Sequence, residues 1–183
     1  MVDNLLNRSS IDKEKLDLIV VGCGPGSFTG IRIGIATAKG LSMALGCPLI
    51  GISTLDALAH AALPCSTPIM PVIDARKSEI FCGLYAPDGT LETPYMNIHP
   101  EKVADYIGQE TLFIGNGIDL YEDIFASTLG GKFRKGLKNL WHPRASVMAL
   151  MAMDRMSESP APEVNPIYVR PSDATLLLQK KQG

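Results

Sequence analysis

The sequence has few of the features that mark membrane, secreted or metal-binding proteins. No apolar run approaches the roughly 18 residues that a membrane-spanning helix needs, and residues 1–4 lack the basic-then-apolar layout of a secretory signal. Its four cysteines form no Cys-x-x-Cys pair, and its three histidines never lie four residues apart. We therefore expect a cytoplasmic protein with reduced thiols, no metal site and no membrane association.

Neither sign of charge predominates in the sequence. The 183 residues carry a net charge of −2, and charge is balanced along most of the chain. Proteins that bind nucleic acid on their own usually present a broad basic surface to the phosphate backbone. Any contact with nucleic acid is therefore expected to be shared with a partner. We interpret the one basic cluster as a solvated loop in preference to a phosphate contact: Lys132, Arg134, Lys135 and Lys138.

Apolar runs alternate with helical patterns along the chain, which is typical of an α/β architecture. The first part is predicted to hold a strand, a helix, a second strand and a second helix, over residues 17–22, 29–45, 48–52 and 55–63. Gly46 is expected to end the first helix, and Ser53 to begin the second with a capping box. The composition changes at 64–68, which predicts a boundary between a first lobe, residues 1–66, and a second lobe, residues 67–183.

The second lobe is predicted to begin with three strands in a meander. The elements expected after it are a helix, a strand, two helices and a strand-like tail, over residues 100–107, 111–115, 120–128, 145–156 and 166–170. Asp74, Arg76 and Glu79 could form an acid–base group near the first turn of the meander. We prefer the interpretation that this segment is a hairpin turn in which the side chains of Asp74 and Arg76 pair with each other.

A glycine loop between the first strand and the first helix is the most informative segment. Clustered backbone amides and the positive end of a helix together favour an anion or a phosphate. The candidate ligands are Gly24, Gly26, Ser27, Thr29 and Gly30. The loop has neither the P-loop ending nor the dinucleotide spacing, and it is no nucleophile elbow. Two interpretations stay open, an anion site and a tight turn capped by Ser27 or Thr29.

The chain resembles the TsaB (YeaZ) family from Asp17 onward. The matching segments are residues 24–34, 38–41, 51–55, 73–76, 115–117 and 166–170. The resemblance implies an actin-like (ASKHA, RNase H-like) α/β fold of two lobes. It also implies a subunit that dimerises with TsaD, the enzyme that transfers threonylcarbamoyl to the adenosine beside the anticodon of certain tRNAs. TsaE, an ATPase, would join the assembly, and tRNA would bind through the complex.

The same resemblance implies a subunit that is not itself catalytic. TsaD-like chains carry a His-x-x-x-His metal pair that is absent from this sequence. The family pattern also begins with strands that carry an Ile-Asp-Thr-type phosphate turn, and nothing like it lies in residues 1–16. We therefore expect an incomplete first lobe with an uncovered sheet edge. We also expect no cofactor of the chain's own, with ATP bound only weakly or at the partner interface.

An alternative function is an actin-like enzyme that holds a nucleotide or an acyl-phosphate in the loop at residues 24–30. A peptidase-like activity has little support, because no nucleophile–histidine pair is evident. The two main alternatives differ in where ATP binds. Tight binding by the isolated chain would favour the enzyme, whereas binding only with TsaD present would favour the subunit.

The helix predicted at 29–45 carries small side chains at a four-residue spacing, which would let a partner helix approach closely. We predict a partner interface of Thr29, Gly30, Arg32, Ile33, Gly34, Thr37, Ala38 and Leu41. The alternative is that this stripe packs on the chain's own sheet. On the first interpretation, Gly34→Leu would prevent docking on TsaD with little change in melting temperature. A homodimer through the same helix is a second open alternative.

Overall fold

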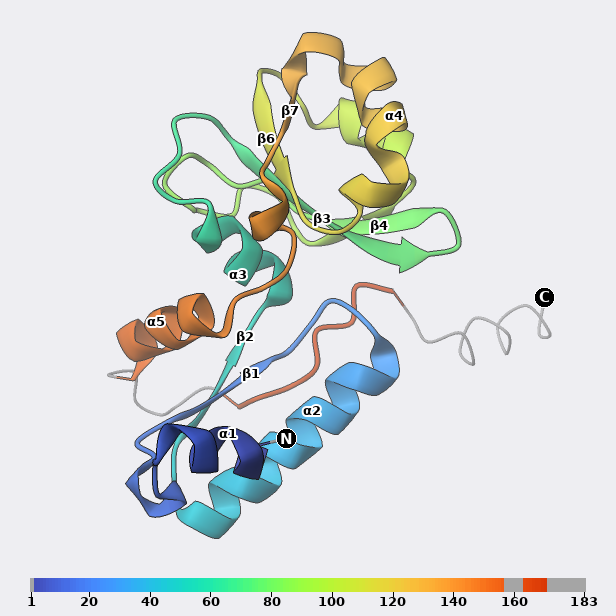
Figure 1. Ribbon diagram of the computed structural model, residues 1–183. Helices are drawn as coiled ribbons and strands as arrows, with labels where there is room; N and C mark the ends of the chain where they lie inside the picture. Colours follow the sequence, from blue (N-terminus) through green and yellow to red (C-terminus); the bar gives the residue numbers. More distant parts are fainter. Residues whose placement is uncertain (1, 157–162, 171–183) are drawn as a thin grey trace, which may run out of the picture.

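The computed structural model describes residues 2–156 and 163–170, which form two sheets with helices packed around them (Figure 1). The strands are β1 (Ile19–Gly22), β2 (Leu49–Ile52), β3 (Ile69–Arg76), β4 (Glu79–Cys82), β5 (Met96–Ile98), β6 (Thr111–Ile114) and β7 (Phe133–Lys135). The α-helices are α1 (Val2–Ser9), α2 (Phe28–Leu45), α3 (Thr54–Ala61), α4 (Ile118–Leu129) and α5 (Ala145–Arg155). Short 3₁₀ helices lie at η1 (Lys13–Lys15), η2 (Pro100–Asp105), η3 (Gly130–Lys132) and η4 (Lys138–Leu140). The α/β class is confirmed.

The first sheet consists of β1 and β2 in the described part of the chain. The two strands are parallel, with Ile19 opposite Leu49 and Gly22 opposite Ile52. Helices α2 and α5 lie on its two sides (Figure 1). Every residue of β1 is only half-buried, whereas Ile50 and Ile52 of β2 are buried. A strand buried on both faces and paired on both edges would be covered throughout, so β1 is only partly covered by the described residues. The expected incompleteness of the first lobe stays a prediction.

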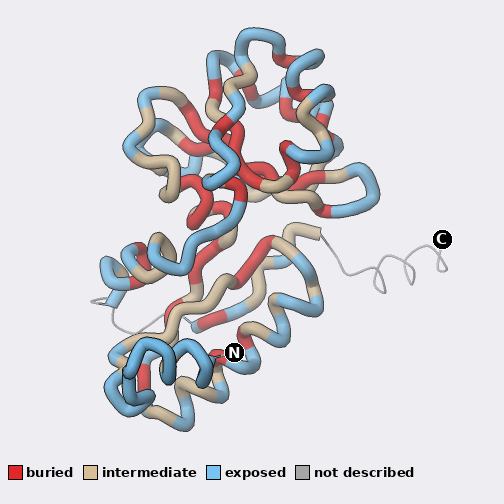
Figure 2. Tube along the Cα trace, in the orientation of Figure 1, coloured by how far each residue is buried: buried red, intermediate tan, exposed pale blue. Residues whose placement is uncertain are grey.

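The second sheet has five strands in the order β5-β4-β3-β6-β7. Strands β3, β4 and β5 form the predicted antiparallel meander, and β3 also pairs in parallel with β6. One face packs against α4 and η2 in a core that contains Val103, Phe113 and Phe125. The other face packs against α3. The buried residues follow both sheets and α3, whereas most of α1 is exposed (Figure 2).

Helices α2 and α3 of the first lobe are capped by residues that the sequence predicted. The Ser27 hydroxyl accepts a hydrogen bond from the Gly30 amide at 3.3 Å, and Gly46 ends α2 with a left-handed φ of 63°. The Ser53 hydroxyl caps α3 in the same way, through the Asp56 amide. The Asp56 carboxylate does not complete the box, because it accepts from the hydroxyls of Tyr85 and Tyr95 at 2.7 and 2.6 Å.

Three segments differ from the predictions. Residues 100–105 form a 3₁₀ helix instead of an α-helix. Residues 133–135 form strand β7 where a loop was predicted, because Phe133 packs on Phe113 while the backbone pairs with β6. Residues 166–170 form no strand, and residues 169 and 170 lie in a bend. Residues 5–16, for which a frayed helix or a loop is expected, contain the end of α1 and the short helix η1.

The chain returns to the first sheet after the second lobe. Met151 and Ala152 of α5 pack with Ile50 and Ile52, and Val164 packs with Cys23. These segments were assigned to the second lobe, yet their packing partners belong to the first. The division of the chain at residue 66 itself stays a prediction, and residues 171–183 of the expected tail lie outside the described residues.

Candidate functional site

The glycine loop leaves the end of β1 and leads directly into α2. Gly24 has a φ of +100°, and a Cβ at this position would lie 2.7 Å from the Ile31 Cδ1 atom and 3.0 Å from the Ile167 carbonyl oxygen. Only glycine fits such a left-handed conformation and such a close approach. The Gly24 carbonyl in turn accepts from the Thr54 amide at 2.7 Å, which ties the loop to the start of α3.

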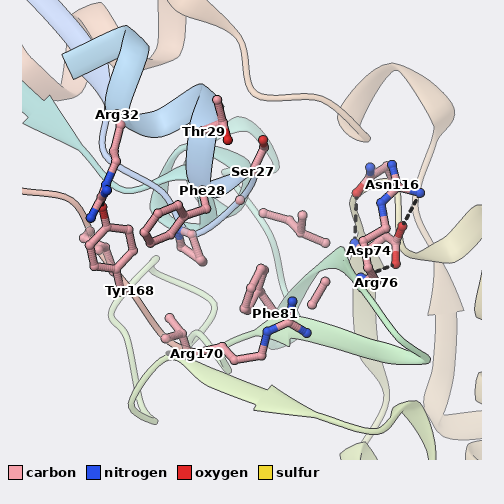
Figure 3. Close-up of a pocket in the computed structure, with 16 residues that line it drawn as sticks. Ser27, Phe28, Thr29, Arg32, Asp74, Arg76, Phe81, Asn116, Tyr168 and Arg170 are labelled. Atoms are coloured by element: carbon pink, nitrogen blue, oxygen red, sulfur yellow. Dashed lines mark hydrogen bonds and ion pairs between the residues drawn. The ribbon is translucent and has the colours of Figure 1, made fainter. Parts of the chain in front are cut away.

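The start of α2 is already partly capped. The Ser27 hydroxyl occupies the Gly30 amide, one of the free N–H groups that an anion would otherwise use. The predicted turn capped by Ser27 is therefore confirmed. Thr29 is exposed and lies at the edge of a cleft, with its hydroxyl near that of Ser27 (Figure 3). Phosphate binding by this loop stays a prediction.

A cleft of about 790 Å³ separates the glycine loop from the second lobe. Its walls come from the loop and the first turns of α2, from the end of β3, from the turn after β6 and from the C-terminal segment at 167–170 (Figure 3). Asp74, Arg76 and Asn116 form the wall opposite the loop. Segments distant in sequence thus meet at this cleft, which lies between the two lobes.

The polar groups of that wall are tied to one another. The Asp74 carboxylate accepts from the Arg76 amide at 2.8 Å and lies 3.5 Å from the Arg76 guanidinium. The Asn116 side-chain oxygen accepts from the Asp74 amide at 3.3 Å. The predicted turn in which Asp74 and Arg76 satisfy each other is confirmed. Glu79, considered for the same group, instead pairs with Arg170 and accepts from Asn97.

Sequence reasoning missed an aromatic cluster beside the loop. The rings of Phe28 and Tyr168 stack with centroids 4.9 Å apart, and the Arg32 guanidinium lies 4.1 Å from the Phe28 centroid. The Arg32 Nε also donates to the Tyr168 hydroxyl at 2.8 Å. Arg32 was predicted in the partner interface, and within the chain its partners are the aromatic side chains of Phe28 and Tyr168. The sequence feature that pointed to this cluster was the match of residues 166–170 to the family pattern.

The structure divides the predicted partner interface between two faces of α2. Thr29, Gly30, Arg32, Ile33 and Thr37 are exposed, Gly34 and Leu41 are half-buried, and Ala38 is buried. Ala38 is only 7 % exposed, so little of its surface is available to a partner, and its place in the interface stays a prediction. A Cβ on Gly34 would lie 3.9 Å from Val21 of β1, so this glycine also faces the chain's own sheet. The small stripe of Gly34 and Ala38 lets α2 approach β1 closely.

The outward face of α2 includes three residues of the predicted interface, Thr29, Ile33 and Thr37, together with four others. It consists of Thr29, Ile33, Ala36, Thr37, Gly40, Met43 and Ala44, all exposed. Ile33 is 62 % and Met43 86 % exposed. The stripe contains no charged residue, and depletion of charge is a property of interface cores. We call these seven residues the outer α2 face. Helical periodicity is compatible with either the outer α2 face or the stripe of Gly34 and Ala38 facing outward. The position of β1 against Gly34 makes the outer α2 face the exposed one.

The basic cluster is engaged in ion pairs of its own lobe. The Lys135 ammonium contacts the Glu122 carboxylate, and Arg134 lies 3.7 Å from that of Glu110. Lys138 lies 4.0 Å from a carboxylate oxygen of Asp119. Surface pairs of this kind contribute little to stability. Each carboxylate nevertheless neutralises a positive charge that would otherwise attract a phosphate group. The segment forms strand β7 and a short 3₁₀ helix instead of the predicted solvated loop, and the absence of a phosphate contact stays a prediction.

The described residues contain neither a metal-binding cluster nor a membrane-spanning helix. No group of three or more His, Cys, Asp or Glu side chains lies together in a way that could hold a metal ion. No helix among residues 2–156 and 163–170 is long and apolar enough to cross a membrane.

Comparison with known proteins gives consistent results. Residues 1–176 match the family model described as TsaD, tRNA N6-adenosine threonylcarbamoyltransferase. The tRNA threonylcarbamoyladenosine biosynthesis protein TsaB of Bacillus subtilis is 32% identical over 163 residues, which cover 84% of this chain and 70% of that protein. The protein of the same name from Escherichia coli is 31% identical over 194 residues, with 100% of this chain and 83% of that protein covered. The solved structure of YeaZ from Pseudomonas aeruginosa superposes with a TM-score of 0.72 at 26% identity, over 92% of this chain and 81% of that one.

Proposed function

This chain belongs to the TsaB (YeaZ) family of tRNA threonylcarbamoyladenosine biosynthesis proteins, and from that premise we propose that it is a non-catalytic subunit. In this role it pairs with TsaD, and the transfer of threonylcarbamoyl to the tRNA adenosine takes place on TsaD. The chain has the actin-like α/β fold of the family. TsaE and tRNA would join through the complex and not through this chain alone.

The single observation that carries the proposal is the outer α2 face. A helix that covers its own sheet with one side presents an uncharged side to the surroundings, with Ile33 62 % and Met43 86 % exposed. When a partner covers the exposed apolar surface of a long helix, the complex is stabilised by about 25 cal/mol per Å² of buried surface. The small neighbours Ala36, Gly40 and Ala44 allow a second helix to approach at short interaxial distance. A helix–helix contact with TsaD fits this surface.

The chemistry of the cleft supports a non-catalytic role. The Ser27 hydroxyl is engaged with the Gly30 amide, and the Asp74 carboxylate with Arg76. No histidine lines the cleft among the described residues. A general base must reach the proton that it abstracts, and the Asp74 carboxylate, the one carboxylate among the described cleft residues, is already paired with Arg76.

The experiment that tests this proposal combines the purified chain with purified TsaD from the same organism. Isothermal titration measures the heat of complex formation, and sedimentation velocity gives its stoichiometry. We expect a heterodimer that forms at micromolar concentrations or below. Failure to bind TsaD, with the chain shown to be folded by circular dichroism, would contradict the proposal. A self-associating chain would show a concentration-dependent sedimentation coefficient in the absence of TsaD.

A second function is favoured by one observation, the position of the cleft at the N-terminus of α2. Thr29 and Arg32 line this cleft of about 790 Å³, and the helix dipole points its positive end toward it. A nucleotide or an acyl-phosphate would suit such a site. The discriminating measurement is an ATP titration of the isolated chain and of its mixture with TsaD. The subunit function predicts weak or no binding by the chain alone, and the enzyme function predicts tight binding.

A further inference from the structure

Residues 163–170 run from the first lobe to the second along the cleft, and we call them the strap. In Figure 1 they form the orange-red segment that passes beside β1 and ends near β4. Ile167, Tyr168, Val169 and Arg170 line the cleft together with the glycine loop. The strap forms no strand with β1 or β4. Its position therefore depends on a few individual contacts.

The strap is anchored to the first lobe by apolar packing and one backbone hydrogen bond. Val164 is 6 % exposed and packs with Cys23 and Ile35, beneath α2. The Ile167 amide donates to the Cys23 carbonyl at 2.8 Å. The Ile167 carbonyl lies so close to Gly24 that a side chain on Gly24 would collide with it. The glycine loop and the strap are thus fitted to each other, with the Cys23 thiol between them and the sheet.

The middle of the strap is held on the first turn of α2. Tyr168 stacks on Phe28, and its hydroxyl accepts from Arg32, whose guanidinium also covers the Phe28 ring. Aromatic pairs and cation–π contacts of this kind each stabilise a local arrangement. These three side chains lie together at one side of the cleft in Figure 3.

The end of the strap is attached to the second lobe by one ion pair. The Arg170 guanidinium donates to the Glu79 carboxylate at 2.9 Å, and both side chains are partly buried, at 19 % and 25 % exposure. The same oxygen of Glu79 accepts from the Asn97 side-chain amide at 2.7 Å. Glu79 begins β4, so this pair joins the second sheet to a segment anchored on the first.

We propose that the strap is a closing device for the cleft between the lobes, with the Arg170–Glu79 pair as its latch. In the closed state the strap covers the glycine loop and holds the two lobes together. A partly exposed ion pair contributes little to stability, and this pair joins the strap to the second lobe, so its loss frees the end of the strap from that lobe. Release of the latch and of the Tyr168 stack lifts the strap, which uncovers Cys23 and widens the cleft.

Cys23 is the probe for strap opening, and Cys82 is the reference within the same molecule. Both thiols are buried, at 4 % and 0 % exposure, but Cys82 packs in the core cluster of the second lobe, which contains no strap residue. Burial raises the pKa of both, that of Cys82 to about 12, so covered thiols react slowly. The intact chain is treated with N-ethylmaleimide, and the labelling rate of each cysteine is read by peptide mass spectrometry.

The variants are Tyr168→Ala, Arg170→Ala and the matched control Arg76→Ala, which removes a cleft arginine that makes no strap contact. We expect Cys23 labelling to rise about tenfold in Tyr168→Ala and about threefold in Arg170→Ala. The rate should stay unchanged in Arg76→Ala, and Cys82 labelling should stay unchanged in all three. The rate follows the fraction of molecules in which the strap is open.

Several results would overturn the proposal. An unchanged Cys23 rate in Arg170→Ala would show that the second lobe does not hold the strap. Equal increases at Cys23 and Cys82 would show that the substitutions loosen the whole fold. Tyr168→Phe adds a test that keeps the ring stack and removes only the hydroxyl that accepts from Arg32. It should raise the Cys23 rate less than Tyr168→Ala does. TsaD is absent from these measurements, so their failure would leave the proposed function untouched.

Discussion

Replacement of Ile33 by alanine should weaken the complex with TsaD without changing the stability of the chain. Ile33 lies near the middle of the outer α2 face and is 62 % exposed in the free chain. Its neighbours on that face are small or uncharged, so an approaching helix would cover most of its surface. Truncation removes apolar surface that matters only in the complex, because little of this side chain packs within the chain itself.

The magnitude follows from the exposed fraction. Full burial of an isoleucine side chain contributes about 1.5–3 kcal/mol. The exposed part, 62 % of that surface, corresponds to roughly 1–2 kcal/mol that only the partner can supply. Each 1.4 kcal/mol is about a tenfold change in Kd. We therefore expect Kd for TsaD to rise about five- to thirtyfold, as measured by isothermal titration, with the melting temperature within about 2 °C of the unmodified chain.

Leu120→Ala provides the matched control. Leu120 lies on α4 of the second lobe and is 61 % exposed, nearly the same as Ile33. A loss of affinity caused by general effects of removing a surface aliphatic group would be equal in both variants. Equal Kd values for the two variants, or a loss of affinity only in Leu120→Ala, would refute the assignment of the outer α2 face as the interface.

Three further predictions follow from the same contacts. Gly34→Leu should now lower the melting temperature by several degrees, because the side chain is directed at Val21, and overpacking costs about 1–3 kcal/mol. Gly40→Leu, which meets nothing within 4 Å, should keep or raise it through helix propensity and instead weaken TsaD binding. The hydrogen bond from Asn97, with a contribution from Arg170, holds the pKa of Glu79 below its ordinary 4.5. This contribution to stability is present above pH 4.5 and is lost as the pH falls through the lowered pKa, so urea unfolding of Glu79→Gln and the unmodified chain should converge in acid.

The sequence predicted most of the secondary structure because the local signals were strong. Ser27 and Ser53 begin helices, Gly46 ends one, and uninterrupted apolar runs mark β1 and β3. It did not predict β7, because a basic segment beside Phe133 looks like a solvated loop. Only the tertiary contact of that ring with Phe113 reveals the strand.

The orientation of α2 shows the limit of helical periodicity. Two stripes, one with Gly34 and Ala38 and one with Ile33 and Gly40, both satisfy the period and both contain small side chains. Which stripe faces the sheet depends on the direction in which the helix crosses β1, and no single residue of the sequence predicts that direction. The strap was missed for a similar reason, since Tyr168 and Arg170 find their partners more than 90 positions away in sequence.

The most direct test of the account is a reconstituted assay of threonylcarbamoyl transfer to tRNA, read by mass spectrometry of the digested nucleosides. TsaD, TsaE, threonylcarbamoyl donor and tRNA are supplied with this chain, without it, and with Ile33→Ala in its place. The account predicts product only when the chain and TsaD are both present. With Ile33→Ala at limiting concentration the product should decrease, and it should recover at high concentration. Formation of the modified nucleoside by this chain in the absence of TsaD would contradict the account.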